Sequence, residues 1–265
     1  MTLPAACLPA DWTPAPDALA GRVVMVTGAA GGLGSAVSIA CAKAGATVLL
    51  TGRKIRALEP VYDAIAGLPD APQPVLQPLD LQGASPLEYQ TLAETIRSQL
   101  GRLDGIVHAA ARFDLLTPLA LLDPEVWLGT LHVNLSAPFL LTQACMPLLQ
   151  ERADSAVVFV LDDPERMTRA HWGAYGVAKA GLAGLVSILH QETDESSLRV
   201  HALLPGPMRS ALRQRAWFGE DTRLLATPEA PARAAVYLLS AEGAAARGKV
   251  LDLRGQQGSG GRGQG

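Results

Sequence analysis

A tyrosine and a lysine lie four residues apart in Tyr175-Gly-Val-Ala-Lys179, and of all side chains in this sequence they are the best suited to moving a proton. On a helix, residues four apart share one face, with Cβ atoms about 5–6 Å apart. A free phenol has a pKa near ~10, and a neighbouring ammonium favours the phenolate and lowers that pKa. Because the chain holds only 4 Tyr, chance produces this spacing in roughly one such chain in fifteen. The spacing predicts a proton-handling pair, with an ordinary surface i,i+4 pair as the alternative.

The elements that must position this pair are indicated by alternating strand-like and helical segments. Apolar runs predict strands at 23–27, 47–51, 75–79, 105–109, 156–161, 199–204 and 249–253. Helical patterns lie between them at 34–44, 55–66, 89–100, 124–149, 173–193 and 228–240. Such alternation predicts parallel βαβ units, with a sheet that is covered on both faces. We expect one doubly wound α/β domain of about seven parallel strands at 20–254, a Pro-rich extension at 1–19, and a Gly-rich, disordered tail at 255–265.

Composition narrows the partners and the compartment. The chain has 265 residues, 49% of them apolar, and a net charge of −3, which gives no indication of a nucleic-acid or anionic-membrane partner. The three cysteines, Cys7, Cys41 and Cys145, lack metal-ligand spacing and suit a reducing compartment. No apolar run is long enough to span a membrane, and the first 19 residues lack the cationic start of a secretory signal. A cytoplasmic location is therefore expected.

A glycine-rich turn follows the first predicted strand and runs into a helix, as Thr27-Gly28-Ala29-Ala30-Gly31-Gly32-Leu33-Gly34. Glycines permit a tight turn and a close approach of backbone N–H groups to a pyrophosphate, and the helix N-terminus adds unpaired donors. The spacing alone is weak evidence in a chain with 26 Gly. Its place in the first βα turn makes a dinucleotide site the stronger interpretation, with a plain flexible turn as the alternative.

The residues after the second predicted strand bear on which nucleotide binds. An NAD site usually carries an acidic residue about 20 residues beyond the glycines, to hold the ribose 2′-hydroxyl. Here Thr51 and Gly52 stand in that region, followed by Arg53 and Lys54. Two cations without a carboxylate favour a 2′-phosphate, so NADP is predicted over NAD; cations that simply face solvent are the competing interpretation.

With these motifs in order, the chain resembles the short-chain dehydrogenase/reductase family over about residues 20–254. The glycine loop (Thr27, Gly28, Gly32, Leu33, Gly34) resembles the family's cofactor loop, and Tyr175 and Lys179 resemble its active-site pair. Further matching segments are Leu79-Asp80-Leu81, where the Asp contacts adenine, His132-Val-Asn134-Leu, and the run from Leu204 to Ser210 with Pro205-Gly206, where Ser210 stands in place of a nicotinamide-contacting Thr. By its position after the fourth strand, Ala109 is also expected to border the cofactor. Arg102-Leu-Asp-Gly-Ile and Ala170-His-Trp-Gly-Ala-Tyr175 are similar to a YciK-like bacterial subgroup.

The resemblance implies a Rossmann fold and a nicotinamide-dependent oxidoreductase. Hydride would pass between nicotinamide and a carbonyl or secondary alcohol while Tyr175 handles the proton on oxygen. Lys179 would hold the nicotinamide ribose and lower the pKa of the tyrosine, and Asn134 would anchor a water that connects Lys179 to solvent. A helix kink or a backbone cap is the alternative role for Asn134.

The sequence also departs from the family pattern at the expected catalytic serine. Thirteen residues before the tyrosine stands Asp162; Ser155 lies some seven residues too early and Thr168 falls in the connecting loop. An ionised Asp162 only accepts hydrogen bonds, and its charge opposes the effect of Lys179 on Tyr175. A protonated Asp162 could donate a bond instead, and an ionised one could bind a cationic or polyol substrate or neutralise Lys179.

Three further departures surround the same site. Ala109 replaces an Asn that cross-links strands, Ala111 replaces a Gly beside the cofactor, and Leu204 stands where Asn is common. The first hypothesis is an NADP-dependent oxidoreductase that uses Tyr175, Lys179 and Asn134, with Asp162 in an altered role. The second is a nucleotide-binding sensor or interaction protein with little or no catalysis.

Features outside the core motifs suggest a substrate and an assembly. The segment between Gly206 and Thr227 interleaves apolar and Arg residues; it resembles a substrate lid that suits a bulky, acidic small molecule, and an amphipathic surface helix explains it equally well. The five His lack metal-ligand spacing, and His171 alone lies beside the predicted site. Helices at 124–149 and 173–193 are apolar on more than one face, which predicts a homodimer or homotetramer, with burial inside the monomer as the alternative.

Overall fold

Eight parallel strands form one sheet in the computed structural model, which describes residues 3–255. The strand order is β1-β8-β7-β6-β5-β2-β3-β4, and every neighbouring pair is parallel. The strands are β1 (Ala5–Ala6), β2 (Val23–Thr27), β3 (Thr47–Gly52), β4 (Val75–Pro78), β5 (Gly105–His108), β6 (Ser155–Val160), β7 (Leu198–Leu204) and β8 (Val250–Asp252). The predicted doubly wound α/β fold is confirmed, and each predicted strand is present to within about a residue at either end.

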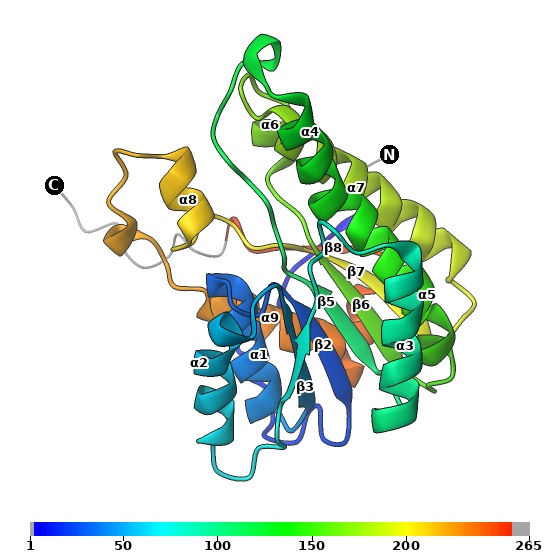
Figure 1. The fold of residues 1–265 in the computed structure, drawn as a ribbon. Helices are drawn as coiled ribbons and strands as arrows, with labels where there is room; N and C mark the ends of the chain where they lie inside the picture. The colour runs from blue at the N-terminus through cyan, green and yellow to red at the C-terminus, as the bar shows by residue number, and fades with distance from the viewer. Residues whose placement is uncertain (1–2, 256–265) are drawn as a thin grey trace, which may run out of the picture.

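Helices cover both faces of this sheet, and Figure 1 shows the two layers on either side of the strands. One layer consists of α1 (Gly32–Lys43), α2 (Ile55–Ala66) and α9 (Glu229–Leu239), and the other of α3 (Pro86–Leu100), α5 (Ala137–Gln150) and α7 (Gly173–Glu192). The central strands β2, β5, β6 and β7 are buried along their whole length. Two apolar cores, one on each face, therefore hold the sheet between the helices.

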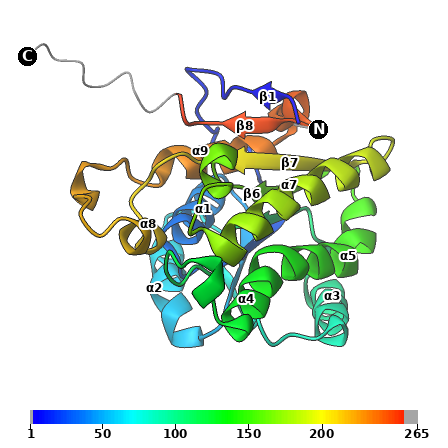
Figure 2. The ribbon, with the colours of Figure 1, turned by 90° about the horizontal axis from the view of Figure 1, so that it is seen from above.

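Strand β1, which was not predicted, comes from the N-terminal extension, and Figure 2 shows it beside β8 at one edge of the sheet. Ala5 and Ala6 pair with Val250 and Leu251. Trp12 anchors the segment, because its ring packs edge-on against Tyr237 at 5.1 Å and its Nε1–H donates to Glu242 at 2.7 Å. Two alanines carry little strand propensity, so no local pattern predicts a strand at this position.

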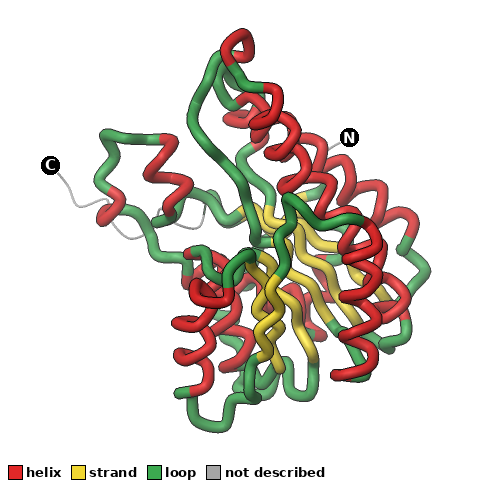
Figure 3. The backbone as a smooth tube through the Cα atoms, in the orientation of Figure 1, coloured by secondary structure: helices red, strands yellow, loops and turns green. Residues whose placement is uncertain are grey.

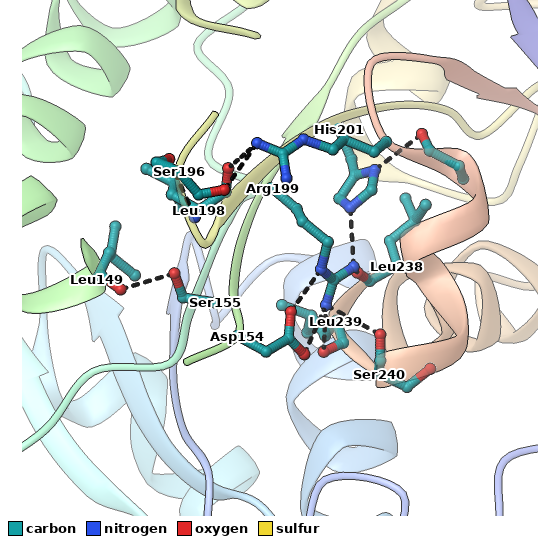
Figure 4. A network of polar contacts seen from close by, with 12 residues as sticks. Leu149, Asp154, Ser155, Ser196, Leu198, Arg199, His201, Leu238, Leu239 and Ser240 are labelled. Atoms are coloured by element: carbon teal, nitrogen blue, oxygen red, sulfur yellow. Dashed lines mark hydrogen bonds and ion pairs between the residues drawn. The ribbon is translucent and has the colours of Figure 1, made fainter. Parts of the chain in front are cut away.

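The far end of α9 is fixed by a buried arginine on β7. The guanidinium of Arg199 donates to the carbonyls of Leu238 and Ser240 at 2.8 and 3.0 Å, and its Nε donates to the carboxylate of Asp154 at 2.7 Å (Figure 4). The last carbonyls of a helix lack backbone partners and carry a partial negative charge, so a cation stabilises them. His201 also belongs to this network, because its Nε2 lies 3.0 Å from the guanidinium of Arg199. Burial is the main cause that lowers the pKa of His201 to about 3.

The long predicted helix at 124–149 is interrupted. It consists of α4 (Pro124–Leu131), a π-helical turn (His132–Ser136) and α5, and the turn contains Asn134. One short helix was not expected, α6 (Pro164–Met167) directly after β6. A second, α8 (Ala211–Ala216), lies in the segment after β7 for which the sequence left a surface helix open. Short helices of four to six residues give almost no periodic signal.

The order of the strands marks the place where ligands bind in such sheets. From β2 the chain winds outward through β3 and β4, then returns to β5 on the other side of β2, so the direction reverses between β2 and β5. A crevice opens at such a switch point beyond the carboxyl ends of the strands. Figure 3 shows the loops that leave this edge, with α8 set to one side above it.

Two remaining expectations concern the chain as a whole. The predicted tail at 255–265 lies, apart from Gly255, outside the described residues. Within residues 3–255, no helix is long and apolar enough to cross a membrane.

Candidate active site at the carboxyl edge of the sheet

Tyr175 and Lys179 lie on one face of α7, buried against the end of β6. Both side chains are about 95% buried, and Lys179 Nζ lies 5.7 Å from the centroid of the tyrosine ring. The ammonium donates a hydrogen bond of 2.7 Å to the carbonyl of Val160, the last residue of β6. The predicted i,i+4 pair is therefore present and faces the sheet, which excludes the surface-pair alternative.

Asp162 stands where the family places its serine and contacts Tyr175 directly. The tyrosine hydroxyl donates to Asp162 Oδ2 at 3.0 Å. Asp162 Oδ1 accepts from the guanidinium of Arg166 and from the backbone N–H of Asp163, the latter at 2.7 Å. All three partners donate, so the carboxylate oxygens accept from each. Ser155 and Thr168 bond backbone carbonyls elsewhere, as their sequence positions indicated.

The tyrosine is not activated in the way that the sequence suggested. Burial raises the pKa of Tyr175 well above its ordinary value, and the charge and hydrogen bond of Asp162 raise it further, while Arg166 lowers it. The expectation of a pKa lowered by Lys179 is therefore wrong for this state of the protein. Desolvation of the phenolate and the adjacent carboxylate outweigh the lowering effect of Arg166.

Burial shifts the pKa of Lys179 in the opposite direction from that of Tyr175. Desolvation of its ammonium lowers its pKa to about 8, and the charge of Asp162 partly offsets that effect. Lys179 bonds a carbonyl rather than Asp162, so the carboxylate is neutralised by Arg166 and not by Lys179.

Asn134 is buried in the π-helical turn and bonds the backbone. Its amide donates to the carbonyls of Thr130 and Arg112, both at 2.8 Å, and its Oδ1 accepts from the N–H of Arg112 at 3.3 Å. The side chain thus ties the turn to the loop after β5. This is the backbone-bonding role that the sequence left open, and within the described residues Asn134 makes no direct hydrogen bond to Tyr175 or Lys179.

The glycine loop has the shape that a pyrophosphate requires. Gly28 has φ +67°, and a Cβ on it would lie 2.7 Å from the Cα of Ala110. A Cβ on Gly34 would overlap the carbonyl of Gly28, so the helix can approach the strand only because glycine stands there. Helix α1 begins at Gly32 after an N-cap without a side-chain hydrogen bond, which leaves its first N–H groups unpaired by a cap. Thr27 supports the loop by accepting from the N–H of Ala110 at 3.2 Å.

The cations predicted to read the 2′-phosphate lie at the end of β3. Arg53 and Lys54 are exposed, and neither forms an ion pair among the described residues. Two such unpaired cations beside the glycine loop fit a phosphate monoester. Asp80 is exposed in a turn and accepts from the N–H of Gln82 at 3.1 Å, whereas Leu81 is buried in the core.

His108, the last residue of β5, makes polar and aromatic contacts just before the segment in which Ala109 and Ala111 replace the family's Asn and Gly. Ala109 and Ala111 carry no polar group, but His108 Nε2 lies 2.8 Å from Thr142 Oγ1, and the imidazole stacks on Phe159 of β6 at 4.8 Å. Burial lowers the pKa of His108 to about 3, so the ring is neutral. A histidine thereby links β5 to α5 and β6 without the expected Asn.

Residues after β7 complete the edge. Pro205, Gly206 and Asp162 line one narrow pocket together with Arg166, and Gly206 adopts φ +72°. Ser210 accepts from the N–H of Arg213 at 3.1 Å and is the N-cap of α8. The same hydroxyl is the one that the resemblance places near nicotinamide.

Aromatic side chains from three segments enclose Tyr175, and the sequence did not reveal them. Phe113 and Trp172 lie 5.4 and 6.0 Å from the tyrosine ring, and Trp217 packs on Trp172 at 5.4 Å. Arg166 lies between the last two, 5.7 Å from Trp172 and 5.1 Å from Trp217. Arg166 is four residues after Asp162, a spacing that could have been recognised only if helix α6 had been expected.

In the lid segment, residues 207–227, arginine side chains bond other groups of the protein. Arg213 pairs with Glu220 at 2.6 Å, and Arg223 pairs with Asp221 at 3.0 Å. Arg215 donates to the carbonyl of Phe113 at 3.1 Å and so fastens the lid over the loop after β5. These contacts do not favour the acidic substrate that the arginine content suggested. His171 is exposed and lines a recess with Trp172 and Tyr175.

Sequence comparison relates this chain to known oxidoreductases. The family model described as short chain dehydrogenase matches residues 22–220. The chain belongs to the short chain dehydrogenase family. It is 36% identical to the uncharacterised oxidoreductase YciK of Escherichia coli K12 over 217 residues, which cover 82% of this chain and 85% of the relative.

Two solved structures extend the likeness to cofactor complexes. A Shigella flexneri 2a short chain dehydrogenase complexed with NADP is 33% identical with TM-score 0.85, covering 90% of this chain and 99% of that one. An Escherichia coli CFT073 short chain dehydrogenase complexed with NADPH is 34% identical, also with TM-score 0.85 and the same coverages.

The buried ammonium predicts a specific pH dependence of stability. The unfolded chain, in which the Lys179 pKa is about 10.5, binds more protons than the folded chain between pH 8 and 10. Stability therefore rises with pH in this window, by about 2 kcal/mol more in the wild type than in Lys179→Met. Urea unfolding at pH 8, 9 and 10 measures the difference, and parallel pH curves for the two proteins would contradict the burial effect.

Proposed function

We propose that this protein is an NADP-dependent oxidoreductase that transfers hydride between nicotinamide and a carbonyl or secondary alcohol of a small molecule. The observation that carries the proposal is the buried Tyr175–Lys179 pair, set on one face of α7 at the carboxyl end of β6, the same edge of the parallel sheet at which the glycine loop follows β2. The two relatives complexed with NADP and NADPH support the choice of cofactor.

The residues present would hold the cofactor along this edge. Gly28, Gly32 and Gly34 with the N-terminus of α1 would bind the pyrophosphate, with Leu33 and Thr27 shaping the turn. Arg53 and Lys54 would bind the 2′-phosphate. Further contacts are proposed for Asp80 and Leu81 at the adenine, for Ala109 beside β5, and for Pro205, Gly206 and Ser210 at the nicotinamide end. When bound, the nicotinamide supplies or accepts the hydride.

The chain's own side chains would manage the proton. Tyr175 would donate to or accept from the substrate oxygen, and Lys179 would fix the ribose and place positive charge near the phenol. Asn134 would hold the π-helical turn beside α7 and anchor a water for proton exchange. The aromatic enclosure of Phe113, Trp172 and Trp217 would exclude bulk water.

A second candidate function rests on a specific contact. The hydroxyl of Tyr175 donates to Asp162 rather than into open space, and Asp162 cannot donate to a developing oxyanion. A nucleotide-binding protein with little or no catalysis, acting as a sensor or interaction partner, would tolerate this arrangement.

Turnover assays separate the two candidates. With NADPH and a panel of aldehydes and ketones, and with NADP⁺ and secondary alcohols, we expect activity that Tyr175→Phe lowers by about 10²–10⁴-fold, the usual worth of a general acid or base. NADPH binding should persist in that variant. Tyr62→Phe, which removes a hydroxyl on the remote helix α2, is the matched control. Binding without any turnover would favour the second candidate, and no binding of either nucleotide would contradict both.

Cofactor preference tests the two cations. Replacing Arg53 and Lys54 by Gln should weaken NADPH binding by at least tenfold, because charge-assisted bonds to the 2′-phosphate contribute about 1.5 kcal/mol or more. NADH binding should stay unchanged. Lys43→Gln, an equal loss of charge at the end of α1, is the control. A wild type that prefers NADH would refute the assignment.

We further propose that a second copy of the chain covers the helical face of α4, α5 and α7, giving a homodimer or homotetramer. Large apolar side chains are exposed on each of these helices: Leu128 at 65%, Phe139 at 43% and Val177 at 49%. Such exposure on adjacent helices suits an interface.

Light scattering should find an assembly that Phe139→Asp or Val177→Asp shifts toward the monomer. Ile55→Asp, which places the same charge on α2 of the opposite layer, should leave the mass unchanged. A monomeric wild type would overturn the assignment.

Two further proposals concern the location of the protein and the limits of its domain. Cys7, Cys41 and Cys145 are all unpaired thiols, which suits a cytoplasmic location. The domain proposed at 20–254 is joined by the extension 1–19 through β1.

A further inference from the structure

The carboxylate of Asp162 is arranged as a proton acceptor for Tyr175. Within residues 3–255, one oxygen, Oδ2, accepts only the tyrosine hydroxyl, at 3.0 Å. The other oxygen, Oδ1, accepts from Arg166 and from the N–H of Asp163, so the carboxylate is fixed from behind. Oδ2 of Asp162 therefore faces the hydroxyl of Tyr175, the group that would contact substrate.

Arg166 is itself held in place by aromatic faces. Its guanidinium lies over Trp172 and Trp217, which belong to the segment before α7 and to the lid. An arginine packed on two indoles loses little further freedom when it pairs with a carboxylate. The ion pair is therefore a fixed part of the site.

We propose that Asp162, held by Arg166, is the base that takes the tyrosine proton, so that Tyr175 relays a proton as a neutral phenol instead of acting as a phenolate. The inference rests on the proposed oxidoreductase function and deepens it. Asp162 is then a catalytic residue, and Arg166 is a positioning residue that acts through it.

The step balances in the direction of alcohol oxidation. The substrate O–H bond breaks and its proton binds the Tyr175 oxygen, while the Tyr175 O–H bond breaks and that proton binds Asp162 Oδ2. The carbinol C–H bond breaks with its electron pair, which the oxidised nicotinamide accepts, and the C=O bond forms. Asp162 then releases its proton to solvent, and reduction follows the same path in reverse.

Two physical considerations favour the relay over a phenolate. Burial and the neighbouring anion raise the pKa of Tyr175 well above its ordinary value, so few molecules carry the phenolate at neutral pH. The carboxylate accepts the tyrosine O–H directly, and the substrate hydroxyl becomes strongly acidic as the hydride leaves, so a weak base suffices at that moment.

The charged groups around the tyrosine are few and identifiable. Among the described residues, the loop after β6, α6 and α7 bring Asp162, Asp163, Arg166 and Lys179, and Arg254 after β8 pairs with Asp163 at 2.9 Å beside Asp162. The loop after β5 brings Asp114, the segment before α7 brings His171, and the lid brings Arg215 to the carbonyl of Phe113. Lys179 titrates in the wild type and in every variant below, and because the charge of Asp162 raises its pKa, the Lys179 midpoint is lower in the Asp162 variants.

The test compares the pH dependence of alcohol oxidation between variants. In Asp162→Ser the relay has no base, so the reaction needs the phenolate, and kcat/KM relative to wild type should rise about tenfold per pH unit from pH 7 to 9. At pH 7 the variant should be at least about 100-fold slower. Arg166→Gln should lower kcat with a flat ratio over the same range and little change in KM, and Arg166→Lys should recover part of the loss. Asp163→Ser, which removes the adjacent carboxylate but keeps an N-cap residue for α6, is the matched control.

A second measurement does not depend on turnover. With tyrosine labelled at ¹³Cζ, the resonance of Tyr175, assigned by its absence in Tyr175→Phe, reports ionisation of the phenol. Asp162→Asn keeps the shape and removes the charge, so the titration midpoint of Tyr175 should fall below that of the wild type. Circular dichroism checks that each variant is folded.

The outcomes separate the relay from the proposed function. An Asp162→Ser variant that is as active as wild type at pH 7, or whose ratio is flat with pH, overturns the relay and leaves the oxidoreductase standing. A wild type that binds NADPH and turns over nothing overturns both the oxidoreductase and the base role. A Tyr175 midpoint unchanged in Asp162→Asn overturns the contact between the two side chains.

Discussion

The hydrogen bond from Lys179 to the carbonyl of Val160 fixes a buried cation where helix α7 meets the end of β6. Charged lysines are seldom buried, because desolvation penalises the ammonium unless polar groups compensate it. Here the cost appears as a pKa lowered to about 8. The bond also sets the rotation of α7, and with it the direction in which Tyr175 points, one turn earlier on the same face.

The charges of the site are balanced by neighbours rather than by solvent. Asp162 faces the phenol on one side and Arg166 on the other, and Arg166 is packed between two tryptophans. A carboxylate alone beside a buried tyrosine would repel the developing oxyanion of a substrate. A carboxylate paired with a fixed guanidinium instead keeps a local acceptor beside the phenol, and the role proposed for Asp162 depends on that pairing.

Rigid anchoring and ligand access are placed at opposite edges of the sheet. At the amino edge, Arg199 and Asp154 fix the end of α9, and Trp12 fastens the N-terminal segment against Tyr237 and Glu242. At the carboxyl edge, glycines, loops and the lid leave backbone donors near the switch point. Stability and binding therefore draw on different residues, as expected when function is carried by loops on a rigid scaffold.

The sequence by itself determined the seven strands from β2 to β8, the glycine loop and the Tyr175–Lys179 spacing. Each of these depends on residues near one another in the chain, where period and turn chemistry act directly. Only the tertiary structure decided the pairing of Ala5 and Ala6 with β8, and the enclosure of Tyr175 by aromatic residues from three segments. It also reversed the predicted pKa shift of Tyr175, because desolvation depends on everything packed around a group and no local pattern records it.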